Sequence, residues 1–384
     1  MTRESLSRQE QITRITFPFW RIPKRPVWLK GKLLGAAGRL ASKLFQLNLE
    51  VGAISPFALT YLEGKLREVG PTLQRDVFVL AWALAPLLDF MEMHQVVIVD
   101  YGGGVGDLSL LAKEAGVGTV VYTDIYDLMC RDAHHIARAL GLEADHYVPG
   151  DVNALLSFVQ EKECSCHAVM SYDVLEHMYD VEEFLCKIPG LSSGRLVLAM
   201  ASAANPKNPL IRRRLKKLQR KMEFNGTARR EGEDPRDTPL AYRPLRRALI
   251  AERAGGLRRE EIDLLASRTR GMRISDIEEA LEAYKTSRTL PPVPEHPTNT
   301  CDPFTGNWCE RLLDPRSVAG KLRERGFAAR VMPGYYGSHG GGSRVKRVAR
   351  LGANVAIRAL GGQGLAVAPF YCVHAVRDAA ADSS

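Results

Sequence analysis

The sequence lacks a long hydrophobic run. Its longest strongly apolar stretch, VFVLAWALAPLL at residues 77–88, contains a proline and is shorter than the roughly 20 residues that a membrane-spanning helix needs. The first residues, MTRESLSRQEQ, include no apolar segment of the kind that a signal peptide contains. These absences predict a chain without a membrane-spanning segment, and we expect it to be cytoplasmic.

Paired cysteines are also missing. The seven cysteines include no C-x-x-C pair, and the C-x-C of Cys164 and Cys166 has no second pair that would complete a zinc site. Cys130, Cys186 and Cys372 sit among apolar residues, where buried thiols are common. The sequence therefore predicts reduced, structural thiols, with neither a disulfide framework nor a bound metal.

Basic residues are scarce in one part of the chain, residues 50–205. The net charge of the whole chain is +9, but it is unevenly distributed. Residues 1–49 contain ten basic and two acidic residues, whereas residues 50–205 contain nine basic and 22 acidic residues. Residues 206–290 carry 22 basic against 13 acidic residues, and residues 336–384 carry six against two. An acidic centre between basic segments favours an anionic substrate or an anionic surface as the partner.

Short β-branched runs alternate with helix-like segments from about residue 96. The helix-like segments carry typical end signals, as in DLSLLAKEAG, which ends at Gly116. This alternation predicts right-handed βαβ crossovers and a mostly parallel sheet with helices on both faces. Seven strands are expected, at residues 96–100, 119–124, 145–151, 167–173, 194–202, 327–337 and 366–377.

The alternation stops near residue 204 and resumes near residue 314. The segment between is rich in arginine, proline and glutamate, and four of its apolar residues have helical spacing: Leu257, Ile262, Leu265 and Ile274. We therefore expect a largely helical insertion between the fifth and sixth strands. Four parts result: a basic helical N-terminal extension at 1–72, a core at 73–203, the insertion at 204–313 and the C-terminal part of the core at 314–384.

Two further segments have amphipathic helical spacing with basic polar faces. In residues 30–47 the cations Lys32, Arg39 and Lys43 lie opposite an apolar stripe made of Leu33, Ala37, Leu40, Leu44 and Leu47. In residues 343–360 the apolar stripe of Val345, Val348, Val355 and Ala359 faces away from Arg347, Arg350, Asn354 and Arg358. Two interpretations are open, namely ordinary helices packed on the domain or helices that lie on a membrane surface.

The stretch VVIVDYGGGVGD, residues 96–107, places four glycines within five positions directly after a predicted strand. A glycine-rich turn between a strand and a helix is where α/β proteins bind nucleotide-like ligands. The dinucleotide pattern G-x-G-x-x-G would need a glycine at Asp107, so that pattern is absent. The pattern that is present is D-x-G-x-G-x-G, formed by Asp100, Gly102, Gly104 and Gly106.

This pattern resembles motif I of the class I S-adenosylmethionine-dependent methyltransferases. Asp124 and Asp151, at the ends of the second and third predicted strands, match two further acidic positions of that family. SYDVLEHMYDVEEFL, after the fourth strand, is similar to a motif of its small-molecule O-methyltransferase branch. The resemblance covers residues 75–203 well and 314–377 in outline, and it implies a Rossmann-like fold with S-adenosylmethionine as the cofactor.

The resemblance also assigns cofactor-binding residues. It implies that Asp100 holds the methionine amino end, that Asp124 accepts both ribose hydroxyls and that Asp151 accepts the adenine amino proton. A carboxylate suits such donors because it offers two acceptor oxygens. The glycines let the methionine and ribose parts lie against the backbone. The full set is Asp100, Tyr101, Gly102, Gly104, Gly106, Asp124, Ile125, Asp151, Val152 and Tyr172.

Methyl transfer from a sulfonium needs alignment of donor and acceptor and, for a hydroxyl acceptor, a base. His177 is the candidate base, with Glu176 or Asp173 to orient it. A structural interpretation stays open, in which Glu176 and His177 only cap and pack a helix. In some relatives acidic residues of this segment bind a divalent metal, but we expect no metal here.

The insertion is expected to form a lid and an acceptor pocket, because a loop this long beside the carboxyl edge of such a sheet usually has a function. Its candidate contacts are Asn205, Tyr242, Arg243, Trp308 and Arg311. We expect a methyltransferase that acts on a hydroxyl of a small-molecule, glycan or lipid-linked acceptor of anionic character. Peripheral association with a membrane is part of this expectation.

Two other functions compete with this one. A nucleic-acid methyltransferase would suit the net charge, but the sequence lacks an Asn/Asp-Pro-Pro-Tyr-type motif after the fourth strand and a recognisable RNA-binding module. A non-catalytic scaffold would have no reason to keep Asp100, Asp124 and Asp151 together. Both alternatives therefore rank below a methyltransferase acting on a small molecule or glycan.

Overall fold

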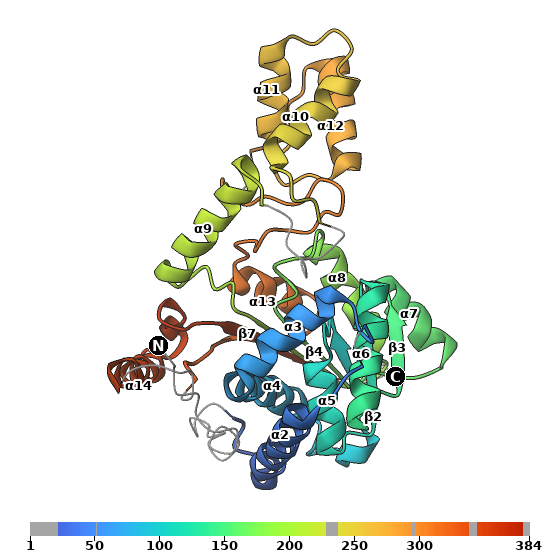
Figure 1. Ribbon diagram of the computed structural model, residues 1–384, viewed down its shortest axis with the longest axis vertical. Coiled ribbons are helices and arrows are strands. Elements are labelled where there is room, and N and C mark those ends of the chain that lie inside the picture. The colour runs from blue at the N-terminus through green and yellow to red at the C-terminus, as the bar shows by residue number, and fades with distance from the viewer. Residues whose placement is uncertain (1–21, 51, 228–236, 294–295, 338–343, 379–384) are drawn as a thin grey trace. The chain divides into compact units, whose positions relative to one another are not determined.

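The computed structural model describes residues 22–50, 52–227, 237–293, 296–337 and 344–378. The chain divides into two compact units (Figure 1). The core unit comprises Met1–Val174, Glu182–Ala203 and Pro315–Ser384, and the insertion unit comprises Leu175–Val181 and Ala204–Asp314. The insertion unit is therefore built from two separate stretches of the chain, one shortly after the fourth strand and one after the fifth.

The described residues of the core unit form a seven-stranded sheet with the order β3-β2-β1-β4-β5-β7-β6. Strands β1 to β5 run parallel, and β7 pairs antiparallel with both β5 and β6. This confirms the expected Rossmann-like, mostly parallel sheet. The strands are β1 Val97–Tyr101, β2 Thr119–Asp124, β3 His146–Pro149, β4 Ala168–Tyr172, β5 Leu196–Ser202, β6 Ala328–Pro333 and β7 Tyr371–Arg377.

Helices cover both faces of this sheet (Figure 1). On β5, Val197, Ala199 and Ala201 belong to the apolar cluster that includes residues of α2, α4, α5 and α6, while the alternate residues Leu198 and Met200 are buried on the other face. The helices of the unit are α2 Val27–Gln46, α3 Pro56–Arg67, α4 Val69–Leu84, α5 Asp107–Ala115, α6 Asp127–Leu140, α7 Val152–Glu161, α8 Val181–Lys187, α13 Pro315–Glu324 and α14 Arg344–Ala359. Short 3₁₀ turns are η2 Met93–Gln95, η3 Ile188–Leu191 and η4 Gly361–Ala366.

The apolar run at residues 77–88 belongs largely to α4, which is buried along its last two turns. This helix runs through residue 72, where the sequence suggested the end of an N-terminal extension, and it packs on α2, α5, β4 and β5. None of the helices among the described residues is long and apolar enough to cross a membrane.

Helix α2 resolves one of the two amphipathic predictions. Leu33, Ala37 and Leu40 are fully buried, and the helix packs on α4 and α5. Its cations Arg39 and Lys43 pair with Glu114 of α5 at 2.6 and 2.8 Å. The amphipathic pattern of α2 is therefore that of an ordinary helix packed within its own unit.

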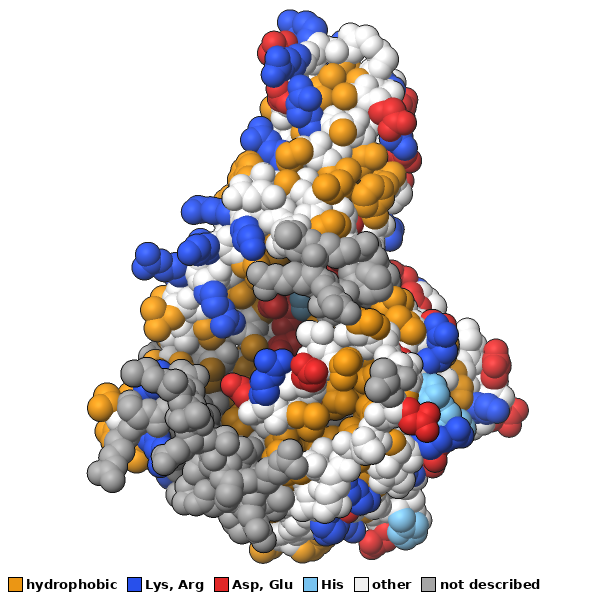
Figure 2. Space-filling view, in the orientation of Figure 1, with side chains coloured by type: hydrophobic (Ala, Val, Ile, Leu, Met, Phe, Trp, Pro, Cys, Tyr) orange, Lys and Arg blue, Asp and Glu red, His pale blue; other side chains and the backbone are white. Residues whose placement is uncertain are grey.

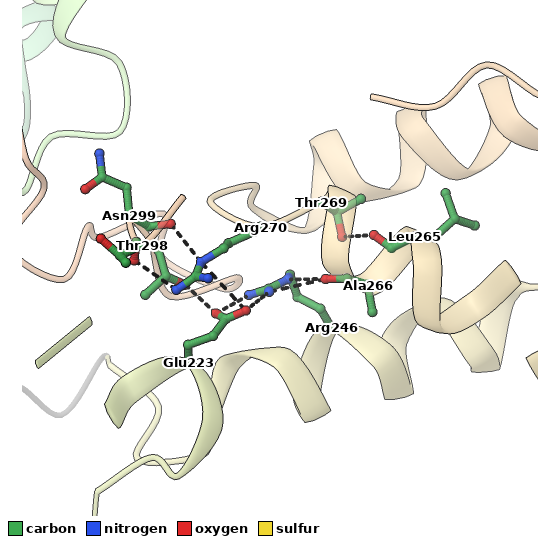
Figure 3. Close-up of polar contacts among 9 residues, drawn as sticks. Glu223, Arg246, Leu265, Ala266, Thr269, Arg270, Thr298 and Asn299 are labelled. Atoms are coloured by element: carbon green, nitrogen blue, oxygen red, sulfur yellow. Dashed lines mark hydrogen bonds and ion pairs between the residues drawn. The ribbon is translucent and has the colours of Figure 1, made fainter. Parts of the chain in front are cut away.

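The insertion unit contains α9 Pro209–Phe224, α10 Tyr242–Arg253, α11 Arg259–Arg268 and α12 Ile274–Ser287. Its apolar core is small and joins the last three of these helices. A buried ion pair adds to this core (Figure 3). The guanidinium of Arg246 on α10 donates to the carboxylate of Glu223 on α9 at 2.6 and 3.2 Å, and it also donates to the carbonyl of Ala266 on α11.

Other groups complete the surroundings of this ion pair. The hydroxyl of Thr300 donates to Glu223 at 2.7 Å, and Arg270 lies 3.8 Å from the same carboxylate. Arg270 in turn donates to the carbonyls of Thr298 and Asn299 (Figure 3). A buried charge is costly unless it is paired and hydrogen-bonded. The network therefore holds α9, α10, α11 and residues 298–300 in one relative arrangement.

We predict that Arg246→Leu lowers the free energy of unfolding of the insertion unit by about 3–5 kcal/mol, because it leaves the Glu223 carboxylate buried without its main partner. Urea denaturation and the hydrogen exchange of the α9–α11 amides measure this effect. The matched control is Arg247→Leu, since Arg247 and its partner Asp263 are about 40% exposed and a surface ion pair contributes little to stability. Equal losses in the two variants would contradict the prediction.

Candidate active site

The turn between β1 and α5 is held in a conformation that requires glycine. Gly102, Gly104 and Gly106 have φ angles of 67°, 54° and 88°, a region that residues with a Cβ rarely adopt. The amides of Gly102 and Gly103 both donate to the carbonyl of Thr123 on β2, at 2.8 and 3.1 Å. The turn is thus tied to the neighbouring strand.

Close packing explains two of the glycines, and open space adjoins a third. A Cβ at Gly102 would come within 2.7 Å of the Val174 side chain, and one at Gly103 within 2.4 Å of the Tyr122 ring. A Cβ at Gly104 would meet no atom within 4 Å. The chain itself therefore approaches two of these positions, and only Gly104 leaves room for another molecule.

Asp100, on β1, is a buried carboxylate with one oxygen unused. Its Oδ2 accepts hydrogen bonds from the amide and the hydroxyl of Ser109, at 3.0 and 2.7 Å. Its Oδ1 is buried and has no hydrogen-bond partner among the described residues. Burial raises the pKa of this carboxyl from 3.8 to about 7. A cationic group at Oδ1 would favour the ionised form, so the residue suits an ammonium ligand.

Asp124, at the end of β2, has both oxygens beside the glycine turn. Oδ2 accepts from the amide of Gly104 at 3.1 Å, and Oδ1 accepts from the amide of Tyr126 at 2.9 Å. A carboxylate oxygen can accept more than one hydrogen bond, so this residue keeps capacity for a diol. The side chain of the next residue, Ile125, is exposed to solvent.

Asp151 follows β3 and is the N-cap of α7, a helix that the sequence analysis did not identify. Its Oδ1 accepts from the amides of Asn153 and Ala154, at 2.8 and 3.3 Å. Burial opposes ionisation of this carboxyl, but the hydrogen bonds from Asn153 and Ala154 outweigh it and lower its pKa. Val152, the first residue of α7, is buried, and so is Tyr101 at the end of β1.

The three acidic residues share one edge of the sheet. β3, β2 and β1 are neighbours in parallel pairing, with Asp100 opposite Tyr122 and Asp124 opposite Pro149. The carboxyl ends of these strands adjoin the point between β1 and β4 where the strand order reverses, which is where open α/β sheets bind ligands. This edge offers an acceptor for an ammonium at Asp100, acceptors for a diol at Asp124 and open space at Gly104. The residues present therefore fit S-adenosylmethionine.

Helix α4 adds two charged residues to this edge that the sequence analysis did not single out. The guanidinium of Arg75 lies 4.8 Å from the ring centroid of Tyr172 and donates to its hydroxyl at 3.3 Å. Asp76 is buried, and burial together with the charge of Asp107 raises its pKa to about 7. The only pattern that marks them is the charged pair Arg75–Asp76 directly before the apolar run of α4.

The residues after β4 belong to both units. Asp173, in the core unit, has a φ of 57°, and its Oδ1 accepts from the amide of Ala203 at 2.6 Å, which links the ends of β4 and β5. His177, in the insertion unit, has its Nδ1 2.9 Å from the carbonyl oxygen of Trp308. Neither Asp173 nor Glu176 takes the orienting position expected from the sequence. The backbone carbonyl of Trp308 takes it instead.

This contact determines the tautomer of His177. A carbonyl oxygen only accepts, so Nδ1 must carry the proton and donate it to Trp308. In the neutral ring Nε2 is then the unprotonated nitrogen, which is the state of a base. The segment is held further by backbone bonds, because the amide of Trp308 donates to the carbonyl of His177 and the amide of Arg311 donates to the carbonyl of Glu176.

The comparisons with known proteins agree with the geometry of the core unit. Residues 99–193 match a family model described as a methyltransferase domain. The chain contains a class I S-adenosylmethionine-dependent methyltransferase domain. Its cofactor is S-adenosylmethionine, as the D-x-G-x-G-x-G pattern implied. The search of curated proteins gave no significant match.

The chain also matches solved structures of methyltransferases, two of which follow. The CurJ carbon methyltransferase is 11% identical with a TM-score of 0.35, and the match covers 91% of this chain and 67% of that one. A SAM-dependent methyltransferase from Aquifex aeolicus is 17% identical with a TM-score of 0.24, over 30% of this chain and 61% of that one.

The expected substrate contacts lie in the insertion unit of the methyltransferase, and most have structural partners there. Asn205 and Tyr242 are buried. Arg243 lies over the Phe224 ring, and Arg311 lies 4.6 Å from the Trp308 ring centroid. Trp308 stacks on Tyr179 and donates from its indole to the Tyr179 carbonyl. Of these residues, Arg243 and Arg311 are partly exposed cations.

A basic surface that the sequence analysis did not separate from the rest of the insertion lies along α9. Figure 2 shows Lys and Arg side chains gathered over this helix. With Pro209 they line a groove of about 450 Å³, and none of them forms an ion pair with a described residue. They are Arg212, Arg213, Lys216, Lys217 and Arg220. Unneutralised cations this close together favour an anionic ligand.

The described residues contain no group of three His, Cys, Asp or Glu side chains arranged to hold a metal ion. Asp173 is engaged with Ala203, and Glu176 is fully buried in the insertion unit. All seven cysteines are free thiols. Burial raises the pKa of the Cys166 and Cys301 thiols to about 12, so these two are unreactive structural residues.

We predict that the stability difference between wild type and Asp100→Asn depends on pH. The folded chain binds the Asp100 proton more tightly than the unfolded chain does, with a pKa near 7 against 3.8. The stabilisation is therefore present below pH 3.8 and is lost as the pH rises to 7. The free energy of unfolding of wild type relative to Asp100→Asn should fall by about 4 kcal/mol between pH 4 and 8.

Urea denaturation at four pH values, without cofactor, measures this difference. Taking the difference between the two proteins cancels the titrating groups that do not interact with Asp100. Asp76 is not one of them, because the charge of Asp100 contributes to the rise of its pKa. Asp89→Asn, at an exposed position, serves as the control for the loss of one carboxylate. A difference for Asp100→Asn that stays constant with pH would contradict the prediction.

Proposed function

We propose that this protein transfers the methyl group of S-adenosylmethionine to a hydroxyl of an anionic small-molecule, glycan or lipid-linked acceptor, with His177 as the general base. The observation that carries the proposal is the contact of His177 Nδ1 with the Trp308 carbonyl, which makes Nε2 the nitrogen without a proton in the neutral ring. A base of this kind is needed for a hydroxyl acceptor.

Asp100 and Asp124 would hold the cofactor. Asp100 offers its free Oδ1 to the ammonium of the methionine part, and Asp124 offers its oxygens to the ribose diol. The absence of neighbouring atoms at Gly104 allows a ligand to lie against the backbone there. When bound, S-adenosylmethionine supplies a methyl group activated by its sulfonium.

His177 would act on the acceptor. Nε2 takes the proton of the acceptor hydroxyl while Nδ1–H stays bonded to the Trp308 carbonyl, and the resulting imidazolium keeps that bond. Backbone bonds between residues 176–177 and 308–311 hold the ring in place within the insertion unit. The general base is therefore positioned by the same unit that carries the α9 cations.

The basic surface of α9 supports the anionic character of the acceptor. Five cations line its groove without carboxylate partners among the described residues. An anionic acceptor gains from such a field, and its association should weaken as salt is added. The same cations would suit the phosphates of a nucleic acid, so RNA is the second candidate acceptor, and a steep salt dependence of RNA affinity would favour it.

We predict that Asp124→Ala abolishes the binding of S-adenosylmethionine measured by calorimetry, with a loss of at least about 100-fold in affinity, because the variant removes both acceptors of the ribose diol. Asp127→Asn, three residues away on α6 and exposed, should bind as wild type does. Equal affinities for wild type and Asp124→Ala would contradict the assignment of the cofactor site.

We predict that His177→Gln lowers kcat by about 10²–10⁴-fold and leaves cofactor affinity unchanged, because glutamine keeps a donor for the Trp308 carbonyl but cannot take a proton. The assay follows S-adenosylhomocysteine release with a panel of phenolic acids and sugar acids. The control is His135→Gln, at an exposed histidine on α6. An unchanged kcat in His177→Gln would rule out this base.

A further inference from the structure

Helix α14 of the core unit exposes the side that the sequence marked as apolar. The exposed fractions of its four largest apolar side chains on this side are 76% for Val345, 70% for Val348, 61% for Leu351 and 56% for Val355. They follow one another at intervals of three and four residues, so they lie on one face of the helix. In α2, whose sequence pattern is similar, the corresponding apolar residues are buried.

The helix is attached through its other side. The side-chain amide of Asn354 donates to the carbonyl of Tyr336 at 2.9 Å, and its oxygen accepts from the amide of Tyr336 at 2.8 Å. Ile357 is fully buried and packs where η4 passes, since a Cβ at Gly364 would meet the Ile357 backbone. The polar residue Asn354 thus faces inward, and the apolar stripe faces away from the unit.

The charges of α14 indicate what covers this stripe. Lys346, Arg347, Arg350 and Arg358 lie along the helix, and residues 344–377 contain no aspartate or glutamate. Cations that border an exposed apolar face are typical of helices that lie in the interface of an anionic bilayer. Two copies of the same face would bring like charges together, which disfavours pairing with a second copy of this chain.

We propose that α14 binds the surface of an anionic lipid bilayer, with Val345, Val348, Leu351 and Val355 entering the acyl boundary and the neighbouring cations meeting the headgroups. The helix lies in the plane of the surface. This binding does not depend on the proposed methyl transfer. If the acceptor is lipid-linked, the binding of α14 brings the enzyme to the membrane surface that holds the acceptor.

The test is flotation of the full chain with vesicles of phosphatidylcholine containing 30% phosphatidylserine, and with vesicles of phosphatidylcholine alone. Wild type should float with the anionic vesicles and partition at least tenfold less onto the neutral ones. Val348→Glu/Leu351→Glu should lose at least tenfold of the anionic binding. Both positions are exposed, so S-adenosylmethionine affinity and the circular dichroism spectrum should be unchanged.

Two further variants sharpen the result. Lys346→Gln/Arg347→Gln should weaken the anionic binding and reduce its salt dependence, because fewer headgroup contacts remain. Leu240→Glu, at an exposed leucine of the insertion unit, should bind as wild type does. Failure of wild type to float would overturn the proposal. Flotation that survives Val348→Glu/Leu351→Glu would also overturn it, because another surface, such as that of α9, would then be responsible.

Sedimentation of the lipid-free chain tests the competing occupant. A dimer that dissociates in Val348→Glu/Leu351→Glu would show that a second copy covers the stripe, and it would overturn the assignment to lipid. A sedimentation coefficient that is the same in wild type and variant, together with the loss of flotation, supports the bilayer.

Discussion

The hydrogen bonds that join the glycine turn to the end of β2 are the constraint on which the active site depends. Gly102 and Gly103 donate to the Thr123 carbonyl, Gly104 donates to Asp124, and the Tyr122 hydroxyl donates to the Gly104 carbonyl at 2.5 Å. These bonds place the start of α5 beside β2 and leave one open position on the turn. Asp100 and Asp124 keep their places only while this pairing of β1 with β2 holds.

The two units differ in how completely their buried charged side chains are hydrogen-bonded. In the core unit, Asp100 keeps one buried oxygen without a partner among the described residues, and burial raises its pKa to about 7. In the insertion unit, Glu223 and Arg246 are buried together and saturated with hydrogen bonds. A buried acceptor without a partner can still bind a ligand, whereas a fully hydrogen-bonded ion pair fixes one arrangement of the helices.

Much of the site could be predicted because it depends on local sequence. The positions of all seven strands and of Asp100, Asp124 and Asp151 follow from β-branched runs and from the residues that end them. Arg75 and Asp76 could not be placed, because their role depends on how α4 packs beside β4. The orienting group of His177 was also not predictable, since a backbone carbonyl 131 residues away leaves no trace in side-chain identity.

The sequence by itself determined the order of elements, the glycine turn and the acidic residue at the end of each strand, because strand period and turn chemistry act over a few neighbouring residues. It also determined that α2 and α14 are amphipathic helices with basic polar faces. Only the tertiary structure decided that α2 buries its apolar stripe while α14 turns its stripe to solvent and docks through Asn354. The hydrophobic pattern defines a face, but the surface available for packing decides where that face points.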